Sequence, residues 1–427
     1  MKYLERSEQL LMGSEVVKES LKSEFYAEKY KGMNVPQTAA DWFSVPVLER
    51  EEIYNNSFPR SKRMLTRDIE DMIIISTGGS SGVARYTTYT HQEWDAFVET
   101  QSEAMKILGI TSKDKVANLF IAGHFWPSFL GLHDCIKKIG AVHLPISANI
   151  PPEEIVKLCL EFEPTVMVSL PTLFVFLADM AQRDGFQFKN LRMIQYAGEG
   201  LSSQAEAHIR KHLKVQEIKS GAYTSADAGL MGYQCDCCPP GVYHVPTGFQ
   251  LVEIINFETG KYAAAGETGE IVVTNLCRTS TPVIRYRVGD AVIPVGEKCA
   301  CGDPNPLIKL AGRAGQDFKI GGGFISMQTI EETIAEFSDF LSLNFQLILE
   351  DIENKMRIEL HVESGARPGE DIIQQFKNKL FDHIKEFKIG TEKGYISEFR
   401  IEIEELGVLP RSPITGKVKK LDDKRVK

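Results

Sequence analysis

The feature of this sequence that most constrains its fold is an alternation of short apolar runs and helical stretches that begins at Lys115. "KVANLFIAG" precedes a helix-like "FWPSFLGLHDCIKKIG", and "AVHLPIS" precedes "PPEEIVKLCLEFEP", whose Pro151 and Pro152 suit a helix start. The rhythm continues through "TVMVSLP", "LRMIQYAGEG" and "EIKSGAYTS". Strands and helices that alternate at this length form right-handed βαβ units. We therefore expect an α/β domain built on a largely parallel sheet.

The sequence on either side of this alternation has a different character. Residues 1 to about 70 read as helices and loops. After Phe249, segments such as "GEIVVTNL" and "VIRYRVGDAVIP" alternate like antiparallel strands, with turns expected at Gly260, Gly266 and Gly269. The large domain is therefore expected to contain a β-rich subdomain.

A second shift in composition falls near Gly312, in "LAGRAGQDFKIGGG". Beyond it we expect a helix at "MQTIEETIAEF", a hairpin across "NFQLILEDIENKMRIELHV", one helix at "EDIIQQFKNKLFDHIKEF", a strand at "EFRIEIEEL" and a basic tail. A chain of 427 residues also exceeds what one core usually serves. We predict a large α/β domain over residues 1–311 and a small, mobile α+β domain over residues 312–427.

Composition excludes several classes of function. Hydrophobic residues make up 43% of the chain and charged residues 25%, which is typical of soluble globular proteins. The formal net charge of -9 argues against nucleic acid as the main partner. The first residues lack an apolar signal segment, and no apolar window is long enough to span a bilayer, so we expect a cytoplasmic protein. Its eight cysteines are then thiols or metal ligands rather than disulfides.

The loop Thr77–Gly82, in "STGGSSGVARY", consists of glycine and hydroxyl residues between two extended stretches. Such a loop lets backbone N–H groups and hydroxyls converge on an anion, and phosphate is the first candidate. It is not the loop of a P-loop NTPase, because Val83 follows Gly82 and no Lys-Ser/Thr pair is present. The next helix begins at Thr90, where "THQE" forms a capping box. Taken alone, the loop is better explained as a flexible surface turn.

Four further segments, in order, resemble the adenylate-forming (acyl-CoA synthetase) superfamily. They are "YAGEGLS" (196–202), "GAYTSADAG" (221–229), "TPVIRYRVGD" (281–290) and "LPRSPITGKVKK" (409–420). The third segment and "FIAGHFWPSFLGLHDCIKKIGAVHLPIS" are very similar to phenylacetate–CoA ligases, and acyl-protein synthetases belong to the same branch. Members of this superfamily activate a carboxylate with ATP to an acyl-AMP and then transfer the acyl group to a thiol.

The resemblance implies a set of nucleotide-binding residues in the large domain. The loop over the β- and γ-phosphates comprises Thr77, Gly78, Gly79, Ser80, Ser81 and Gly82. Adenine would be lined by Gly198, Glu199 and Gly200. Tyr223 would stack on adenine, Asp290 would accept hydrogen bonds from both ribose hydroxyls, and Arg313 would assist it. Tyr223 could also be an ordinary core aromatic, and Asp290 a turn acid.

The small domain contributes the expected catalytic cation. Lys417, in "TGKVK", matches the lysine that crosses to the α-phosphate and the incoming carboxylate. A donor that acts in the transition state is worth roughly 10²–10³ in rate. Without its "PRS…TGK" setting, Lys417 would be interpreted as a solvated tail lysine.

The sequence departs from the family pattern at three places. The acid expected to bind Mg²⁺ is Asp227 rather than the usual glutamate, and Thr224 or Ser225 would have to supply the missing hydroxyl. The phosphate loop lacks its usual lysine, so Arg85 is the nearest cation. The hinge acid is replaced in "GRAGQD", which leaves the pivot residue unassigned.

A cluster of soft ligands lies in "YQCDCCPPGVYH" and "EKCACGDPNP". Its spacings, C-x₂-C, C-x₅-H and C-x-C, are typical of a tetrahedral Zn²⁺ site in a cytosolic chain. The resemblance to phenylacetate–CoA ligases favours the C-x₅-H pair and the later C-x-C. The expected ligands of a structural Zn²⁺ are Cys238, His244, Cys299 and Cys301, with Cys235 as substitute. The alternative, buried free thiols, suits Cys135, Cys159 and Cys277 far better.

The resemblance places the carboxylate substrate beneath the "GHFWPSF" turn. His124, Phe125 and Trp126 are candidates for its wall, and aromatic walls suit an aromatic or medium-length apolar acid. Phe125 and Trp126 could equally pack a helix against the sheet, whereas His124 could steer the carboxylate.

The sequence thus predicts an AMP-forming acid–thiol ligase that uses ATP, Mg²⁺ and a structural Zn²⁺, with coenzyme A as the expected acceptor. Two alternatives stay open. One is an adenylating enzyme that loads a carrier-protein phosphopantetheine or a protein cysteine. The other is a zinc-stabilised nucleotide-binding protein without turnover. A homodimer is also left open.

Overall fold

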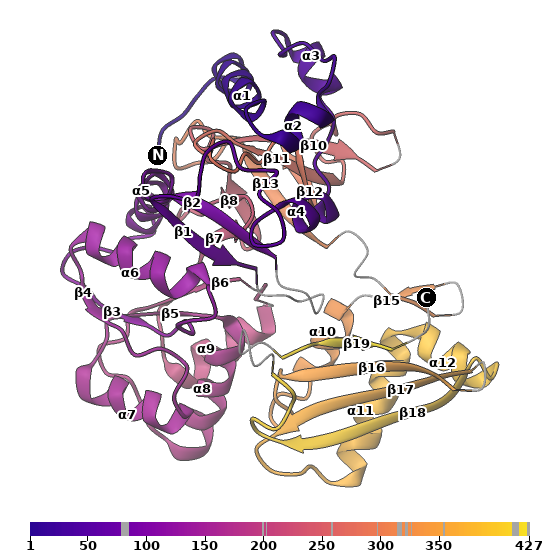
Figure 1. The fold of residues 1–427 in the computed structure, drawn as a ribbon. Coiled ribbons are helices and arrows are strands. Elements are labelled where there is room, and N and C mark those ends of the chain that lie inside the picture. Colours follow the sequence, from indigo (N-terminus) through magenta and orange to yellow (C-terminus); the bar gives the residue numbers. More distant parts are fainter. Residues whose placement is uncertain are drawn as a thin grey trace.

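The computed structural model describes residues 1–77, 85–198, 200–201, 203–257, 259–296, 298–313, 318–320, 323–325, 327–352, 355–411 and 418–424. The predicted fold class is confirmed. A helix-flanked parallel sheet and an antiparallel sheet form the larger part, and a small α+β part follows (Figure 1).

The central sheet has the strand order β4-β3-β5-β6-β7-β8. Every pair from β4 to β7 is parallel, and β8 adds to β7 in the antiparallel sense. The strands are β3 (Lys115–Asn118), β4 (Val142–Leu144), β5 (Val166–Ser169), β6 (Met193–Ala197), β7 (Glu217–Ser225) and β8 (Gly229–Gly232). The sequence alternation from Lys115 therefore produced the βαβ sheet that it predicted.

Five helices cover the two faces of this sheet. They are α5 (His91–Ile107), α6 (Pro127–Ile139), α7 (Pro152–Phe162), α8 (Pro171–Asp184) and α9 (Ser203–Leu213). Side chains of α5 and α6, such as Trp94 and Leu132, pack on one face, whereas those of α7, α8 and α9, such as Ile155 and Phe174, pack on the other. The capping box at Thr90 is confirmed, since Thr90 Oγ1 accepts a hydrogen bond from the Glu93 N–H and Glu93 accepts one from the Thr90 N–H.

The β-rich region is a five-stranded antiparallel sheet of order β10-β11-β12-β13-β9. Its strands are β9 (Val242–His244), β10 (Gln250–Asn256), β11 (Gly269–Asn275), β12 (Tyr286–Val295) and β13 (Leu307–Arg313). Gly260 and Gly266 adopt positive φ, as their expected turns require. Gly269 does not form a turn: it opens β11, where a Cβ atom would lie 2.6 Å from the Ile255 carbonyl oxygen.

The N-terminal helices pack against this antiparallel sheet. They are α1 (Arg6–Ser20), α2 (Glu24–Lys29), α3 (Ala39–Ser44) and α4 (Arg50–Asn56). Buried Val17 and Trp42 share one apolar core with Leu251 and Val273 of the sheet. A separate hairpin, β1 (Met72–Ser76) and β2 (Tyr86–Thr90), flanks the Gly/Ser loop.

The C-terminal part contains a four-stranded sheet of order β18-β17-β16-β19. Its elements are α10 (Met327–Ala335), β16 (Phe345–Ile352), β17 (Lys355–Ser364), α11 (Glu370–His383), α12 (Lys385–Glu392), β18 (Ile396–Glu405) and β19 (Leu421–Asp423), after a short pair β14 (Phe318–Ile320) and β15 (Gly323–Ile325). One expectation was wrong. The single helix breaks at Ile384, whose φ of -117° and ψ of 84° are not helical. The basic tail also contains β19, a strand that was not predicted and that pairs with β16.

The C-terminal part packs on α8 and α9 (Figure 1). Ile330 and Leu341 belong to the same apolar core as Phe174. The Ser342 hydroxyl donates a 2.8 Å hydrogen bond to Asp179, a carboxylate that also contacts His208 at 2.7 Å. The division of the chain at Gly312 stays a prediction. None of the described helices is long and apolar enough to cross a membrane.

Candidate active site

Two of the residues predicted to bind the nucleotide meet where the two large sheets approach each other. Tyr223 lies on β7 of the parallel sheet and Asp290 on β12 of the antiparallel sheet, 67 positions further along the chain. The Tyr223 hydroxyl donates a 2.6 Å hydrogen bond to Asp290 Oδ2. In the β12–β13 ladder, Asp290 is the direct partner of Arg313. The predicted adenine, ribose and assisting residues therefore come from three neighbouring strands.

The expected Mg²⁺ ligand, Asp227, is held by an ion pair. Its side chain is only 2% exposed, and its Oδ2 lies 2.8 Å from Nη2 and 3.1 Å from Nε of Arg85. The Tyr286 hydroxyl donates to the same oxygen at 3.2 Å. Although burial opposes the charged form of Arg85, the Asp227 carboxylate raises the pKa of that guanidinium above its usual value. Arg85, which the sequence indicated as the nearest cation, therefore neutralises the acid expected to hold the metal.

The other carboxylate oxygen of Asp227, Oδ1, lacks the contacts that Oδ2 makes. Oδ1 is buried and has no hydrogen-bond partner among the described residues. A carboxylate oxygen is the kind of ligand that Mg²⁺ prefers. A metal at Asp227 would therefore use Oδ1, or Arg85 would have to release Oδ2.

The base of the loop predicted to bind phosphate is closed by hydrogen bonds between Thr77 and Arg85. The Thr77 N–H donates to the Arg85 carbonyl at 2.9 Å, and the Arg85 N–H donates to Thr77 Oγ1 at 3.1 Å. Gly78, Gly79, Ser80, Ser81 and Gly82 lie outside the described residues, and so do Glu199 and Lys417. Gly198, at the end of β6, has a φ of 81°, which favours glycine, and Gly200 is exposed. Arg85 thus connects the base of the loop to Asp227.

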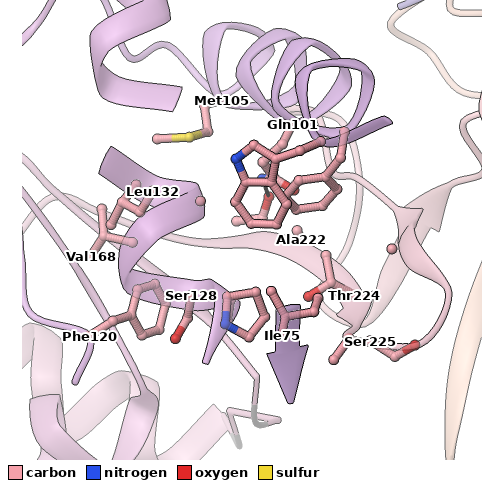
Figure 2. Close-up of a pocket in the computed structure, with 18 of the residues that line it drawn as sticks. Ile75, Gln101, Met105, Phe120, Ser128, Leu132, Val168, Ala222, Thr224 and Ser225 are labelled. Carbon is pink, nitrogen blue, oxygen red and sulfur yellow. Dashed lines mark hydrogen bonds between the residues drawn. The ribbon is translucent and has the colours of Figure 1, made fainter. Parts of the chain in front are cut away.

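An apolar cavity lies between α5, α6 and strands β5 to β7 (Figure 2). It encloses about 800 Å³, including its open mouth. Trp94, Phe97 and Met105 of α5 form one wall, and Leu132 of α6 contributes to another. Thr224 and Ser225, both predicted site residues, line it beside Ala226, one residue before Asp227. The cavity therefore extends to the residue that precedes Asp227, and Asp227 forms the acidic corner of the site.

The predicted wall residues His124, Phe125 and Trp126 lie beside this cavity rather than in its lining. His124 and Phe125 form an exposed turn with positive φ, and Trp126 is buried and stacks on His124. Ser76 fixes the turn, since its N–H donates to the Phe125 carbonyl and its hydroxyl donates to the His124 carbonyl, both at 2.8 Å. The cavity wall begins one residue later, at Pro127.

Most of the cavity wall that the structure describes was not predicted. In the sequence, the apolar stripe of α5 indicates only that this helix packs on something. The one unusual member of that face is Gln101, four residues after Phe97, and it also lines the cavity. A glutamine within an apolar stripe was the available signal.

A second candidate site lies in the antiparallel sheet. The possible ligand atoms of Cys235, His244, Cys299 and Cys301 all lie within 4.8 Å of one another. Sγ of Cys235 is 3.5 Å from His244 Nε2 and 3.5 Å from Sγ of Cys299. Tetrahedral Zn²⁺ with bonds of about 2.3 Å to sulfur separates its ligands by about 3.8 Å, so the donor set fits this ion.

The geometry favours Cys235, the expected substitute, over Cys238 as the fourth ligand. Cys238 Sγ lies 3.5 Å from Cys235 Sγ, but Cys238 is not in the group whose ligand atoms all converge. His244 Nδ1 lies 3.1 Å from the Asn305 carbonyl oxygen, a hydrogen bond that leaves Nε2 for a metal. Although burial opposes it, hydrogen bonds that include one with the Cys301 backbone lower the pKa of Cys299 to about 7.

Comparison with known proteins finds related sequences. A family model described as AMP-binding enzyme matches residues 155–279. A phenylacetate-coenzyme A ligase from Pseudomonas putida is 24% identical over 359 residues, covering 82% of this chain and 78% of the relative. An indoleacetate–lysine synthetase from Pseudomonas savastanoi is 23% identical over 397 residues, covering 89% and 90%.

The fold has similar solved structures. A 2-hydroxyisobutyryl-CoA ligase in the postadenylation state, in complex with 2-HIB-AMP, aligns with a TM-score of 0.81 at 17% identity. The alignment covers 97% of this chain and 88% of that one.

Proposed function

We propose that this chain, whose resemblance to the adenylate-forming superfamily the comparisons confirm, is an AMP-forming acid–thiol ligase. In this proposal ATP converts a carboxylic acid to an acyl-AMP, and the acyl group then passes to a thiol, with coenzyme A as the expected acceptor. The observation that carries the proposal is the 2.6 Å hydrogen bond between Asp290 and Tyr223, whose chain neighbours Ala222 and Thr224 line the apolar cavity.

Strand β7 explains why this contact matters. Successive side chains of a strand point to opposite faces. Ala222 and Thr224 line the cavity, whereas Tyr223, between them, reaches Asp290. A nucleotide on Tyr223 and an acid in the cavity would therefore lie on the two faces of one strand end. This proximity is what attack of a carboxylate on an α-phosphate requires.

Each residue has a defined chemical task in the proposed adenylation. Asp290 accepts hydrogen bonds from both ribose hydroxyls, and Tyr223 offers its ring to adenine. The acid's oxygen attacks the α-phosphorus and pyrophosphate leaves. Lys417 neutralises the charge that develops on the α-phosphate. In the second step the thiolate sulfur attacks the acyl carbon and AMP leaves.

Mg²⁺ would be held next to Asp227, with Thr224 or Ser225 supplying the hydroxyl that the family pattern places there. When bound, such an ion neutralises charge on the triphosphate. Asp227 can offer its buried Oδ1, which lacks a partner among the described residues. Arg85 meanwhile places a second cation at the base of the phosphate loop.

The Cys/His cluster is proposed to hold a structural Zn²⁺. Cys235 follows β8, His244 ends β9, and Cys299 and Cys301 lie between β12 and β13. An ion there would connect three segments of the β-rich region. Four protein ligands leave no open position, so a role in stability is favoured over one in chemistry.

The acid is proposed to be aromatic or apolar and of medium length, because Trp94, Phe97 and Met105 line the cavity. An acid panel scored by pyrophosphate exchange tests activation. Mass detection of the product with coenzyme A, a phosphopantetheine-loaded carrier protein or free lysine then identifies the acceptor. Lysine is included because the indoleacetate–lysine synthetase matches over 90% of its length. A cytoplasmic location and a homodimer stay predictions.

A further inference from the structure

Two glutamines are part of the mainly apolar lining of the cavity. Gln101 lies on α5 and Gln195 on β6, and both line the cavity. Gln195 is only 1% exposed and occupies a central strand, between β5 and β7. Strands of a parallel sheet that are covered on both faces are usually apolar throughout. A glutamine at this position therefore needs an explanation.

Each of these two amide groups keeps one polar atom without a hydrogen-bond partner among the described residues. Gln101 Nε2 donates a 3.3 Å hydrogen bond to the Gly221 carbonyl. Gln101 Oε1 is buried without a partner among the described residues, and so is Gln195 Nε2. Native proteins rarely leave buried polar groups without hydrogen bonds. One unpaired acceptor and one unpaired donor thus belong to the lining of the same cavity.

Gly221 makes room for this pair. It lies at an irregularity in the β6–β7 ladder, where Tyr196 pairs with Ser220 but Ala197 pairs with Ala222. A Cβ atom on Gly221 would lie 2.8 Å from Cγ and 2.9 Å from Cδ of Gln195. The missing side chain therefore provides the space that Gln195 occupies, and both glutamines lie against one glycine.

The glutamines lie at the end of the cavity remote from the acidic corner. Gly221 precedes Thr224 by three residues of strand, or about 10 Å. Figure 2 shows Gln101 on the opposite side of the cavity from Ser225. None of the described residues that line the cavity is charged. An acid whose carboxylate lies near Ser225 would therefore direct the far end of its body toward a neutral donor and a neutral acceptor.

We propose that Gln101 and Gln195 select an aromatic carboxylic acid that carries a hydroxyl group on the end of its ring remote from the carboxylate. The hydroxyl donates to Gln101 Oε1 and accepts from Gln195 Nε2, and Trp94 and Phe97 contact the ring. A hydroxyl is the smallest neutral group that both donates and accepts. This inference rests on the proposed function, because it names the substrate class of the same cavity.

Equilibrium binding to the full chain tests the inference without turnover. The probes are 4-hydroxyphenylacetate and phenylacetate, and binding is measured by calorimetry or dialysis. We expect the hydroxylated acid to bind at least about tenfold more tightly, because the unsubstituted acid leaves both amide groups unpaired. Equal binding of the two acids would overturn the proposal.

Variants assign the selectivity to the glutamines. Gln101→Met and Gln195→Met keep the length of the side chain and remove its amide. Each is expected to reduce the preference to about threefold or less, mainly by weakening the hydroxylated acid. Gln374→Met, at an exposed position of α11, is the matched control and should keep the full preference. A preference that survives both cavity variants contradicts the proposal. Because Gln101 is only partly buried, its variant keeps the test decisive if Gln195→Met fails to fold.

Pyrophosphate exchange separates this inference from the proposed function. If the protein binds the hydroxylated acid selectively but no acid supports pyrophosphate exchange, the ligase proposal is wrong and the selectivity proposal stands. Exchange that proceeds equally well with both acids defeats the selectivity proposal alone.

Discussion

The Cys/His cluster and the apolar cavity both enclose polar atoms, but they leave those atoms in opposite situations. In the cluster, the ligand atoms of Cys235, His244, Cys299 and Cys301 converge within 4.8 Å, so that one ion can satisfy all of them. In the cavity, Gln101 Oε1 and Gln195 Nε2 have no partner among the described residues. The convergent set is suited to stabilising the fold, whereas the unpaired set is suited to recognising a substrate. Changes in the first region should therefore alter stability, and changes in the second should alter specificity.

The largest expected effect comes from the metal cluster. Cys301→Ser should lower the free energy of unfolding by about 4 kcal/mol or more, because a structural ion contributes directly to folding. Metal analysis should find close to one zinc per native chain, and chelation should lower the melting temperature. Cys237→Ser, at an exposed neighbour outside the convergent set, is the matched control.

The same experiment decides between the two candidates for the fourth ligand. Cys235→Ser should cause zinc loss and Cys238→Ser should not, if the observed convergence defines the site. Native protein without zinc would break the comparison, since the cluster would then be a set of free thiols.

The next largest effect concerns catalysis without a change in stability. Lys417→Ala should lower the rate of acyl-AMP formation by roughly 10²–10³, because the charge on the α-phosphate then loses a donor. Its melting temperature should equal that of the wild type. Lys419→Ala serves as the control. Lys419 lies two positions away and forms an ion pair with Asp422, so its substitution should keep the rate of acyl-AMP formation. Full acyl-AMP formation by Lys417→Ala would show that this lysine has another role.

Substitutions at Asp290 and Tyr223 should have smaller effects, which are measured on the KM for ATP and differ in size between the two residues. Asp290→Ala should raise the KM for ATP by about 10- to 100-fold, as expected when hydrogen bonds to a charged group are lost. Tyr223→Phe removes only the hydroxyl that holds Asp290 and should raise it by less than about tenfold. Initial rates at saturating acid measure both. An unchanged KM in Asp290→Ala would separate this corner from the nucleotide.

How far the sequence predicted these regions depends on whether the pattern lies within one segment or requires distant segments to pack together. The alternation from Lys115 predicted the parallel sheet because apolar periodicity is local. The nucleotide roles of Asp290 and Tyr223 were expected only through a resemblance, and their contact was not predicted, since two sheets must pack before the residues meet. The role of Gln101 was not predicted, because whether a helix stripe faces a core or a cavity depends on how α6 packs.

Other details depended on the local path of the chain. The resemblance favoured Cys238, but the chain turns after Cys235, and it is Cys235 that converges with His244. Strand β19 was hidden because three residues within a charged tail carry almost no periodic signal. The break at Ile384 was missed because the apolar helical pattern continues across it.

The smallest expected effect concerns Gly221 and Gln195 in the cavity wall. Gly221→Ala should lower the free energy of unfolding by roughly 1 kcal/mol, because the new methyl group meets the Gln195 side chain. In a Gln195→Ala background the same change should cost less. Chemical denaturation of the wild type, the two single variants and the double variant measures this coupling. Purely additive effects on the free energy of unfolding would show that Gly221 does not make room for Gln195.

The central claim is that this protein activates a carboxylic acid with ATP, and ATP–pyrophosphate exchange across an acid panel tests it most directly. The account predicts exchange that depends on an aromatic acid and is lost in Lys417→Ala. Zinc-replete protein that binds ATP but shows no exchange with any acid would contradict it.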